Sequence, residues 1–203
     1  MKVARKKSAR GRPREFDADV ALDAAMRLFW RHGYEGTSLP ALTKAMGINR
    51  PSLYAAFGNK EQLFRKALDR YTEQAGCMIK AALNQPTSRG VVESLFRAAV
   101  APCAKTDEGR GCMLVQSALA CSKESSRLQK EVLRRREAVE LLLRDRFIRA
   151  RAEGDLPADA NPAALAKFVV TVQHGLAVQL AGGVDREELR AAVEIALKAW
   201  PSS

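Results

Sequence analysis

Positively charged side chains are concentrated at the start of this 203-residue chain. Seven of its 34 lysines and arginines precede Glu15, and no acidic residue lies among them. A localised basic stretch is the electrostatic feature expected of a nucleic-acid binder. A solvated tail and a targeting signal have the same composition, so three interpretations are open. The run ARGRPRE, residues 9–15, contains the arginines of interest: Arg10, Arg12 and Arg14.

The residues after this tail have the pattern of a helix. Asp17 is a candidate N-cap and Gly33 a candidate C-cap, because a short acidic side chain accepts from free N–H groups and glycine ends helices. Apolar residues recur between them at helical spacing. The predicted inward face consists of Val20, Ala24, Leu28 and Phe29.

Two further short helices follow. The run TSLP, residues 37–40, provides a hydroxyl cap and a proline for the first turn, and Gly47 ends the helix after Leu42 and Met46 have faced the core. Asn49 can cap the next helix, while Gly58-Asn59 closes it and caps a fourth. Two short helices joined by a tight turn with glycine are a helix-turn-helix pattern.

The helix after that turn has two different faces. Leu53, Ala56 and Phe57 lie on one side and are expected to pack inward. The opposite face is small and polar with a single charge, as a helix that reads the major groove requires, although an ordinary amphipathic helix is the alternative. The residues on or beside this outward face are Arg50, Pro51, Ser52, Tyr54 and Ala55.

The rest of the chain contains helical patterns only. They run over residues 59–83, 88–104, 111–122, 124–153, 161–182 and 185–200. We find no strand pattern and no repeat. The sequence therefore predicts an all-α protein with three parts: a basic disordered arm (1–14), a three-helix helix-turn-helix domain (15–64) and a larger helical domain (65–203).

Other classes of function find little support. The four cysteines form no CxxC pair, and neither GxSxG, HExxH nor a phosphate-binding glycine loop occurs. No apolar stretch without charge reaches the ~20 residues that cross a bilayer. We expect no enzymatic activity, no metal, no cofactor and no membrane partner, and a cytoplasmic location.

At this point the motifs are specific enough to name a family. Residues 11–64, GRPREFDADVALDAAMRLFWRHGYEGTSLPALTKAMGINRPSLYAAFGNKEQLF, closely resemble the N-terminal domain of the tetracycline-repressor (TetR) family of bacterial transcription regulators. The resemblance lies in the LF...HGYEGTS join, the L..L....GI...LY..F..K run, and their spacing. It implies a homodimer in which each subunit presents one helix-turn-helix, and an unknown small effector that releases double-stranded, pseudo-palindromic operator DNA.

The resemblance also implies roles for single residues. Thr37, Ser38, Tyr54 and Lys60 would contact DNA phosphates, the first two where the amino end of a helix favours an anion. Arg50, Pro51, Ser52 and Ala55 would face base edges, and of these Arg50 alone can make a bidentate contact with guanine. Because Pro51 and Ala55 are small and apolar, thymine methyl groups or DNA shape would carry part of the specificity.

The basic tail acquires a specific hypothesis from its position. RGRP, residues 10–13, resembles the core of the AT-hook, a minor-groove arm, and here it directly precedes a helix-turn-helix domain. Arg10, Arg12 and Arg14 would then enter the minor groove beside the operator. A solvated tail that helps only by general attraction is the alternative.

The second domain offers candidates for an effector pocket and a dimer interface. For each pocket candidate, ordinary core packing is the favoured alternative to ligand contact, and the apolar stripes assigned to the interface could instead complete a monomer core. The pocket candidates are Tyr71, Met78, Phe96, Met113, Gln116, Gln173 and His174. The interface candidates are Phe168, Val172, Leu176, Leu189, Val193, Leu197 and Trp200.

Two alternatives to a ligand-released repressor remain. Cys112 follows the loop DEGRG at a predicted helix start beside Arg110, which would favour a thiolate and a redox- or electrophile-sensing repressor. A sequence-tolerant architectural DNA-binding protein would also use the basic arm. The arginines around residues 134–136 alternate with acidic residues and are interpreted as a solvated, ion-paired helix face.

Overall fold

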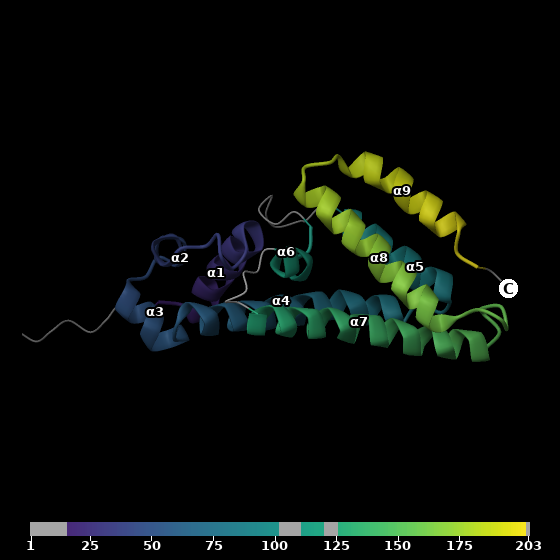
Figure 1. Cartoon of the computed structure of the whole chain (residues 1–203), viewed down its shortest axis with the longest axis horizontal. Coiled ribbons are helices and arrows are strands. Elements are labelled where there is room, and N and C mark those ends of the chain that lie inside the picture. Colours follow the sequence, from purple (N-terminus) through teal and green to yellow (C-terminus); the bar gives the residue numbers. More distant parts are fainter. Residues whose placement is uncertain (1–15, 102–110, 120–125, 202–203) are drawn as a thin grey trace, which may run out of the picture.

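The computed structural model describes residues 16–101, 111–119 and 126–201, and every regular element in these ranges is an α-helix. The predicted all-α fold is confirmed. Figure 1 shows an elongated molecule with the first helices at one end and α8 and α9 at the other. The helices are α1 (Ala18–His32), α2 (Leu39–Met46), α3 (Arg50–Phe57), α4 (Lys60–Leu83), α5 (Ser88–Val100), α6 (Met113–Leu119), α7 (Ser126–Ala152), α8 (Pro162–Ala181) and α9 (Arg186–Lys198). Arg10, Arg12, Arg14 and Arg110 lie outside the described residues.

The predicted capping residues set the bounds of the first helices. Asp17, Ser38 and Asn49 accept hydrogen bonds from backbone N–H groups in the first turns of α1, α2 and α3. Asn59 forms a reciprocal capping box with Gln62 at the start of α4. These bonds satisfy N–H groups that have no partner within the helix. The start of each helix is therefore fixed by residues close to it in sequence.

The predicted inward faces need two corrections. The buried stripe of α1 consists of Ala21, Ala25, Met26 and Phe29, and Val20 is 62% exposed. The stripe is thus displaced by one residue toward the C-terminus from the predicted Val20 and Ala24. In α3, Leu53 and Phe57 are buried as expected, but Ala56 is exposed because it lies past the edge of this narrow contact face.

The hydrophobic interior consists of two clusters. The first core combines buried residues of α1 to α4 with Met113, Leu114, Leu128 and Val132 of α6 and α7. The second core combines α5, the second half of α7, α8 and α9. α4 contributes to both, with Phe64 and Leu68 in the first core and Ala82 in the second. The expected domain boundary at residues 64/65 therefore falls within one continuous helix.

Between the two cores lies a section in which three helices contribute no buried residue. Along α4 no residue from 69 to 81 is buried, along α7 none from 133 to 142, and along α8 none from 171 to 175. We call these three segments the middle section. The helices meet in this section through polar side chains: Arg135 of α7 pairs with Asp69 of α4, and Arg136 of α7 lies 2.8 Å from His174 of α8.

The C-terminal end of α4 is fixed by a buried arginine. Arg146 of α7 donates from Nε to Leu83 O at 3.3 Å, and from Nη2 to Gln85 O at 3.0 Å and Pro86 O at 3.2 Å. These carbonyls have no partner within the helix, so the guanidinium acts as a cap supplied by another helix. The two long helices are joined firmly at this end.

α8 is long and apolar enough, by length and composition, to cross a membrane. It nevertheless contacts α5, α6, α7 and α9, and Ala166, Val169, Val170, Leu176 and Leu180 belong to the second core. These contacts are those of the central helix of a helical domain.

Candidate functional site

The turn between α2 and α3 holds the two helices in a fixed relation. Gly47 adopts the left-handed conformation at φ 66° and ψ 25°, where a side chain would be strained. Ile48 N donates to Thr43 O at 3.1 Å, and Leu42 and Leu53 are fully buried on the inner sides of the two helices. α3 is therefore presented as a rigid element.

The outer face of α3 brings together the residues expected to read DNA. Arg50, Pro51, Tyr54 and Ala55 are exposed. Ser52 is half-buried, and its backbone N–H donates to the Asn49 cap at 2.8 Å. No acidic residue occurs in this helix. The face can donate hydrogen bonds through one guanidinium and the hydroxyls of Ser52 and Tyr54, and it can make apolar contact through its small residues.

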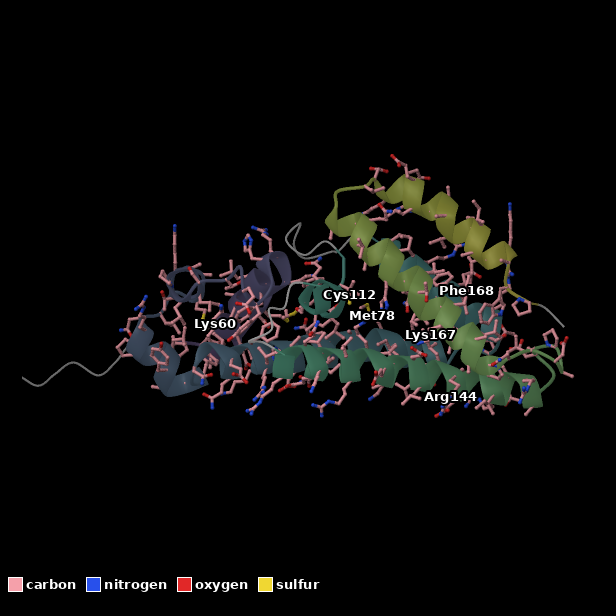
Figure 2. The ribbon with its side chains drawn as sticks, in the orientation of Figure 1. Lys60, Met78, Cys112, Arg144, Lys167 and Phe168 are labelled. Atoms are coloured by element: carbon pink, nitrogen blue, oxygen red, sulfur yellow. The ribbon has the colours of Figure 1, made fainter. Side chains whose placement is uncertain are left out.

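The residues expected to bind phosphates differ in their surroundings. Ser38 is exposed, and its hydroxyl accepts from Ala41 N at 3.3 Å. Lys60, labelled in Figure 2, begins α4 with its Nζ 4.3 Å from the centroid of the Tyr34 ring. Partial burial lowers the pKa of Lys60, and Glu35 opposes this shift. Lys60 follows shortly after α3, whereas Tyr54 lies within α3 and is exposed.

Thr37 requires a correction. Its side chain is buried, and its hydroxyl donates to Gly33 O at 2.7 Å. This bond joins the start of α2 to the end of α1. The Thr37 hydroxyl therefore stabilises the fold locally and is turned away from an external phosphate.

Ion pairs tie α4 to α1 and α7 beside the first core. Arg70 pairs with Asp23 at 3.0 Å and with Asp19 at 3.2 Å, and the bond to Asp23 is the main cause that raises the pKa of Arg70. Arg135 of α7 donates to Asp69 at 2.6 Å and to Thr72 at 2.9 Å. Exposed pairs contribute little individually, but here they set the relative positions of three helices.

The predicted pocket residues do not form one set. Phe96 and Met113 are fully buried in different cores, where they are packing residues. Tyr71, Met78, Gln173 and His174 lie on the middle section, and Met78 is 60% exposed. Figure 2 labels Met78 on α4 and Lys167 and Phe168 on α8. Gln116 is half-buried on α6.

Cys112 lies where three helices meet. Tyr71 Oη of α4 donates toward Cys112 Sγ at 3.4 Å, directly before α6 begins. The Tyr71 ring contacts Trp30 of α1 edge-on, with centroids 5.0 Å apart. Cys112 is half-buried and packs against the first core. A change at this sulfur would therefore act on α1, α4 and α6 together.

A polar contact that the sequence did not predict joins α7 to α8. Arg136 Nη2 lies 2.8 Å from His174 Nδ1. Burial is the main cause that lowers the pKa of His174 to about 4; Arg136 and Lys167 act in the same direction, and Glu140 opposes them. The imidazole is neutral at neutral pH, so Nδ1 accepts from the guanidinium and the ring proton resides on Nε2.

The residues predicted for a dimer interface face inward instead. Leu189, Val193, Leu197 and Trp200 of α9, with Leu176 of α8, are buried in the second core. Phe168 and Val172 are half-buried against the same core. The apolar stripe of α9 packs against α5 of the same subunit. It therefore completes the core of the protomer, which was the alternative interpretation. The exposed large apolar residues of α8 and α9 are Val178, 46% exposed, and Ile195, 69% exposed.

Comparison with known proteins decides the family. The family model described as "Bacterial regulatory proteins, tetR family" matches residues 21–67. The HTH-type transcriptional repressor ComR of Escherichia coli K12 is 35% identical over 198 residues, which are 96% of this chain and 94% of ComR. The chain belongs to the TetR family.

Solved structures of similar proteins agree over nearly the whole length. A cysteine mutant of the regulator CifR, complexed with 26-bp double-strand operator DNA, is 47% identical with a TM-score of 0.88, covering 94% of this chain and all of that chain. The reduced form of E. coli NemR, 17% identical with a TM-score of 0.73 over 91% of this chain and 97% of that chain, shares the fold. CifR is a TetR family transcriptional regulator, and ComR is a transcriptional repressor.

The pKa of His174 generates a prediction about stability. An unperturbed histidine has a pKa of 6.5. Because the folded state has the lower pKa, the unfolded state binds a proton more readily as the pH falls below 6.5. The free energy of unfolding should therefore decrease from pH 6.5 toward pH 4, and His174→Gln should flatten that decrease in urea titrations.

The other histidine provides the control. His32 is exposed at the end of α1. His32→Gln should retain the pH dependence of the original protein. Equal slopes for the original protein and His174→Gln would show that His174 does not titrate as described.

Proposed function

We propose that this TetR-family regulator is a homodimeric repressor that binds a pseudo-palindromic operator and is released by a small-molecule effector. The observation that supports it most is the outer face of α3, on which Arg50, Pro51 and Ala55 are exposed together above a buried Leu53 and Phe57. The CifR operator complex, at 47% identity, indicates the same use for a closely similar chain.

Sequence recognition would combine contacts of two kinds. Arg50 and Ser52 would donate to base edges, while Pro51 and Ala55 would contact thymine methyl groups. Ser38, Tyr54 and Lys60 would bind phosphates and fix the register of α3 in the groove. Arg10, Arg12 and Arg14 would add a minor-groove arm.

Deleting residues 1–14 should then lower both the affinity for the operator and the dependence of that affinity on salt. An unchanged salt slope would argue against the arm.

Selection of bound duplexes from a random DNA pool, at physiological salt, tests the proposed function directly. An inverted repeat should be enriched, because two symmetry-related α3 helices read equivalent half-sites. Enrichment of A·T content alone would favour an architectural protein that binds through its arm. A regulator should prefer its operator over unrelated duplexes by ~10³-fold or more.

Replacing the arginine on the reading face should weaken operator binding selectively. We expect Arg50→Ala to raise the Kd for the selected operator by about tenfold to a hundredfold, since a bidentate arginine–guanine contact contributes ~1–3 kcal/mol. Fluorescence anisotropy measures the change. Lys198→Ala, at an exposed position on α9, is the matched control and should bind as the original protein does. An equal loss on operator and unrelated DNA would assign Arg50 to phosphate contact instead.

The dimer would form through the outer faces of α8 and α9. Val178 and Ile195 are exposed there, on the sides of these helices that face away from the second core. Around them lie small residues that permit close helix approach: Thr171, Gly175, Ala191, Ala192 and Ala199, all exposed. This face replaces the interface residues predicted from the sequence.

A charge placed on that face should separate the subunits. We expect Ile195→Arg to weaken dimerisation by about a hundredfold or more, because an unpaired charge would be buried between the subunits. Sedimentation should then show the 22.3 kDa monomer at concentrations where the original protein is dimeric. Val20→Arg, on the exposed side of α1, should leave the dimer intact. Dimers of Ile195→Arg would place the interface elsewhere.

Release would be transmitted through α4. An effector in the middle section would contact residues of α4 between Asp69 and Ala81, and the start of the same helix follows shortly after α3. A shift of α4 would change the distance between the two reading helices of the dimer. Because operator half-sites have a fixed spacing, such a change lowers affinity.

A thiol-responsive repressor is the second candidate, supported by the contact between Tyr71 Oη and Cys112 Sγ at 3.4 Å. A group added to Cys112 would displace Tyr71 and, through it, Trp30 of α1. Alkylation with N-ethylmaleimide should then release the operator from the original protein and from Cys77→Ser, but not from Cys112→Ser. Release of all three, or of none, would contradict sensing by Cys112.

A further inference from the structure

The ring of Tyr34 is held in the turn between α1 and α2. It stacks on Phe29, with ring centroids 6.4 Å apart, and it packs on Phe64 with centroids 5.1 Å apart. Both phenylalanines are fully buried in the first core, whereas Tyr34 is half-buried. Its backbone carbonyl accepts from Thr37 N at 3.4 Å. The ring therefore has a fixed position at the edge of the first core.

A lysine from the start of α4 lies over this ring. Lys60 Nζ is 4.3 Å from the ring centroid, within the ~6 Å at which an ammonium group is attracted by the negative face of an aromatic ring. Burial is the main cause that raises the pKa of Tyr34, and Glu61 and Glu35 act in the same direction. The phenol is therefore neutral at neutral pH, and the attraction comes from the ring itself.

A second lysine of α4 shows what such a contact looks like when it serves the fold. Lys66 Nζ lies 5.5 Å from the centroid of the Phe57 ring and donates to Ala56 O at 3.1 Å. This carbonyl belongs to the last turn of α3, so Lys66 caps that helix. Lys60 Nζ has no hydrogen-bond acceptor in the part of the chain that the structure describes. Its N–H donors remain available to an external anion.

The position of Lys60 suits a phosphate of bound DNA. Lys60 lies at the end of the molecule that carries α2 and α3 (Figure 2). The exposed Ser38 caps α2 at the same end, directly after Thr37, whose N–H is bonded to the Tyr34 carbonyl. Tyr34 is thus joined to two positions proposed to bind phosphates, by its ring to Lys60 and by its backbone to the start of α2.

An aromatic ring can prepare a lysine for binding in a way that a carboxylate cannot. A free lysine side chain has many rotamers, and fixing one of them on binding has an entropic cost. A ring that already restricts the ammonium group lowers this cost. An ion pair with a carboxylate would also restrict it, but that pair would have to break before a phosphate could bind. The Tyr34 ring restricts Lys60 without neutralising its charge.

We propose that Tyr34 is a positioning residue for DNA binding: its ring holds the Lys60 ammonium group where that group binds an operator phosphate. Lys60 makes the contact, and Tyr34 acts through it. This inference rests on the proposed function, because it takes Lys60 as one of the phosphate contacts of the repressor. A ring contact that only stabilised the fold would change the free energy of unfolding, but not the number of phosphates neutralised in the complex.

The test measures the operator affinity of the full-length protein by fluorescence anisotropy over a range of salt concentrations. The logarithm of the affinity falls linearly with the logarithm of the salt concentration, with a slope of about −0.9 for each phosphate neutralised. Lys60→Ala removes one contact from each subunit, so the slope for the dimer should become shallower by about 1.8. Lys198→Ala, at an exposed position on α9, is the matched control and should keep the original slope.

Changes at position 34 separate attraction by the ring from its packing. Tyr34→Phe keeps the ring and should keep the slope. Tyr34→Leu removes the ring, so it should weaken operator binding at physiological salt by about threefold to tenfold and shift the slope toward that of Lys60→Ala. Trifluorophenylalanine at this position has nearly the shape of phenylalanine but a less negative ring face. It should bind the operator more weakly than Tyr34→Phe does, with the same helix content by circular dichroism.

A double variant shows whether Tyr34 acts through Lys60. If the ring positions the ammonium group, adding Tyr34→Leu to Lys60→Ala should change neither the affinity nor the slope further. Urea unfolding of each variant measures the contribution of the ring to stability separately. If Tyr34→Leu does not fold, the comparison of phenylalanine with trifluorophenylalanine tests the same claim, because it preserves the packing on Phe29 and Phe64.

Several outcomes would overturn the inference. They are an unchanged slope in Lys60→Ala, an unchanged slope in Tyr34→Leu beside a shallower one in Lys60→Ala, additive losses in the double variant, and equal operator binding with phenylalanine and trifluorophenylalanine at position 34. The first outcome also removes Lys60 from the proposed phosphate contacts, but it does not contradict the repressor. Failure of the duplex selection would contradict the repressor itself.

Discussion

The two hydrophobic cores of this protein share one helix, and the rest of the structure depends on that constraint. α4 contributes Phe64 and Leu68 to the first core and Ala82 to the second, with no buried residue from 69 to 81. A continuous helix is stiff over this distance because each turn is hydrogen-bonded to the next. Movement of α4 in the middle section must therefore displace the helix-turn-helix unit at its start.

The two ends of α4 are held by different interactions. Its C-terminal end is capped by the buried Arg146 and packed against the second core. Its first half is held by the first core and by ion pairs of Arg70 and Arg135 with acidic residues. Buried contacts resist displacement more than exposed ion pairs do. Because α6 and α7 complete the first core through Met113, Leu128 and Val132, a displacement of either helix also reaches that core directly.

The sequence predicted the local structure well because local structure has local causes. Asp17, Ser38, Asn49 and Asn59 cap helices through bonds to residues two or three positions away, and Gly47 ends α2 for conformational reasons. The all-α fold and the family followed from the same short-range signals. The reading face of α3 was predictable because it lies opposite Leu53 and Phe57.

Features that depend on contacts distant in sequence were not predictable in this way. The stripe through Leu189, Val193 and Leu197 indicates that α9 buries one face, but not whether α5 of the same subunit or a second subunit covers it. The Thr37 hydroxyl was assigned to phosphate, but the end of α1 provides its acceptor. Arg136 resembled the arginines beside it, since nothing local reveals that its side chain meets His174, 38 residues away.

The central claim is that α4 connects the middle section to the helix-turn-helix unit. The most direct test is hydrogen–deuterium exchange of the backbone amides, with and without an operator duplex taken from the selection. The account predicts that DNA binding slows exchange in α2 and α3 and also in α4 between residues 73 and 81, beyond Tyr71, which still packs against the first core. Protection confined to residues 16–64 would contradict it, because the reading helices would then bind DNA independently of the middle section.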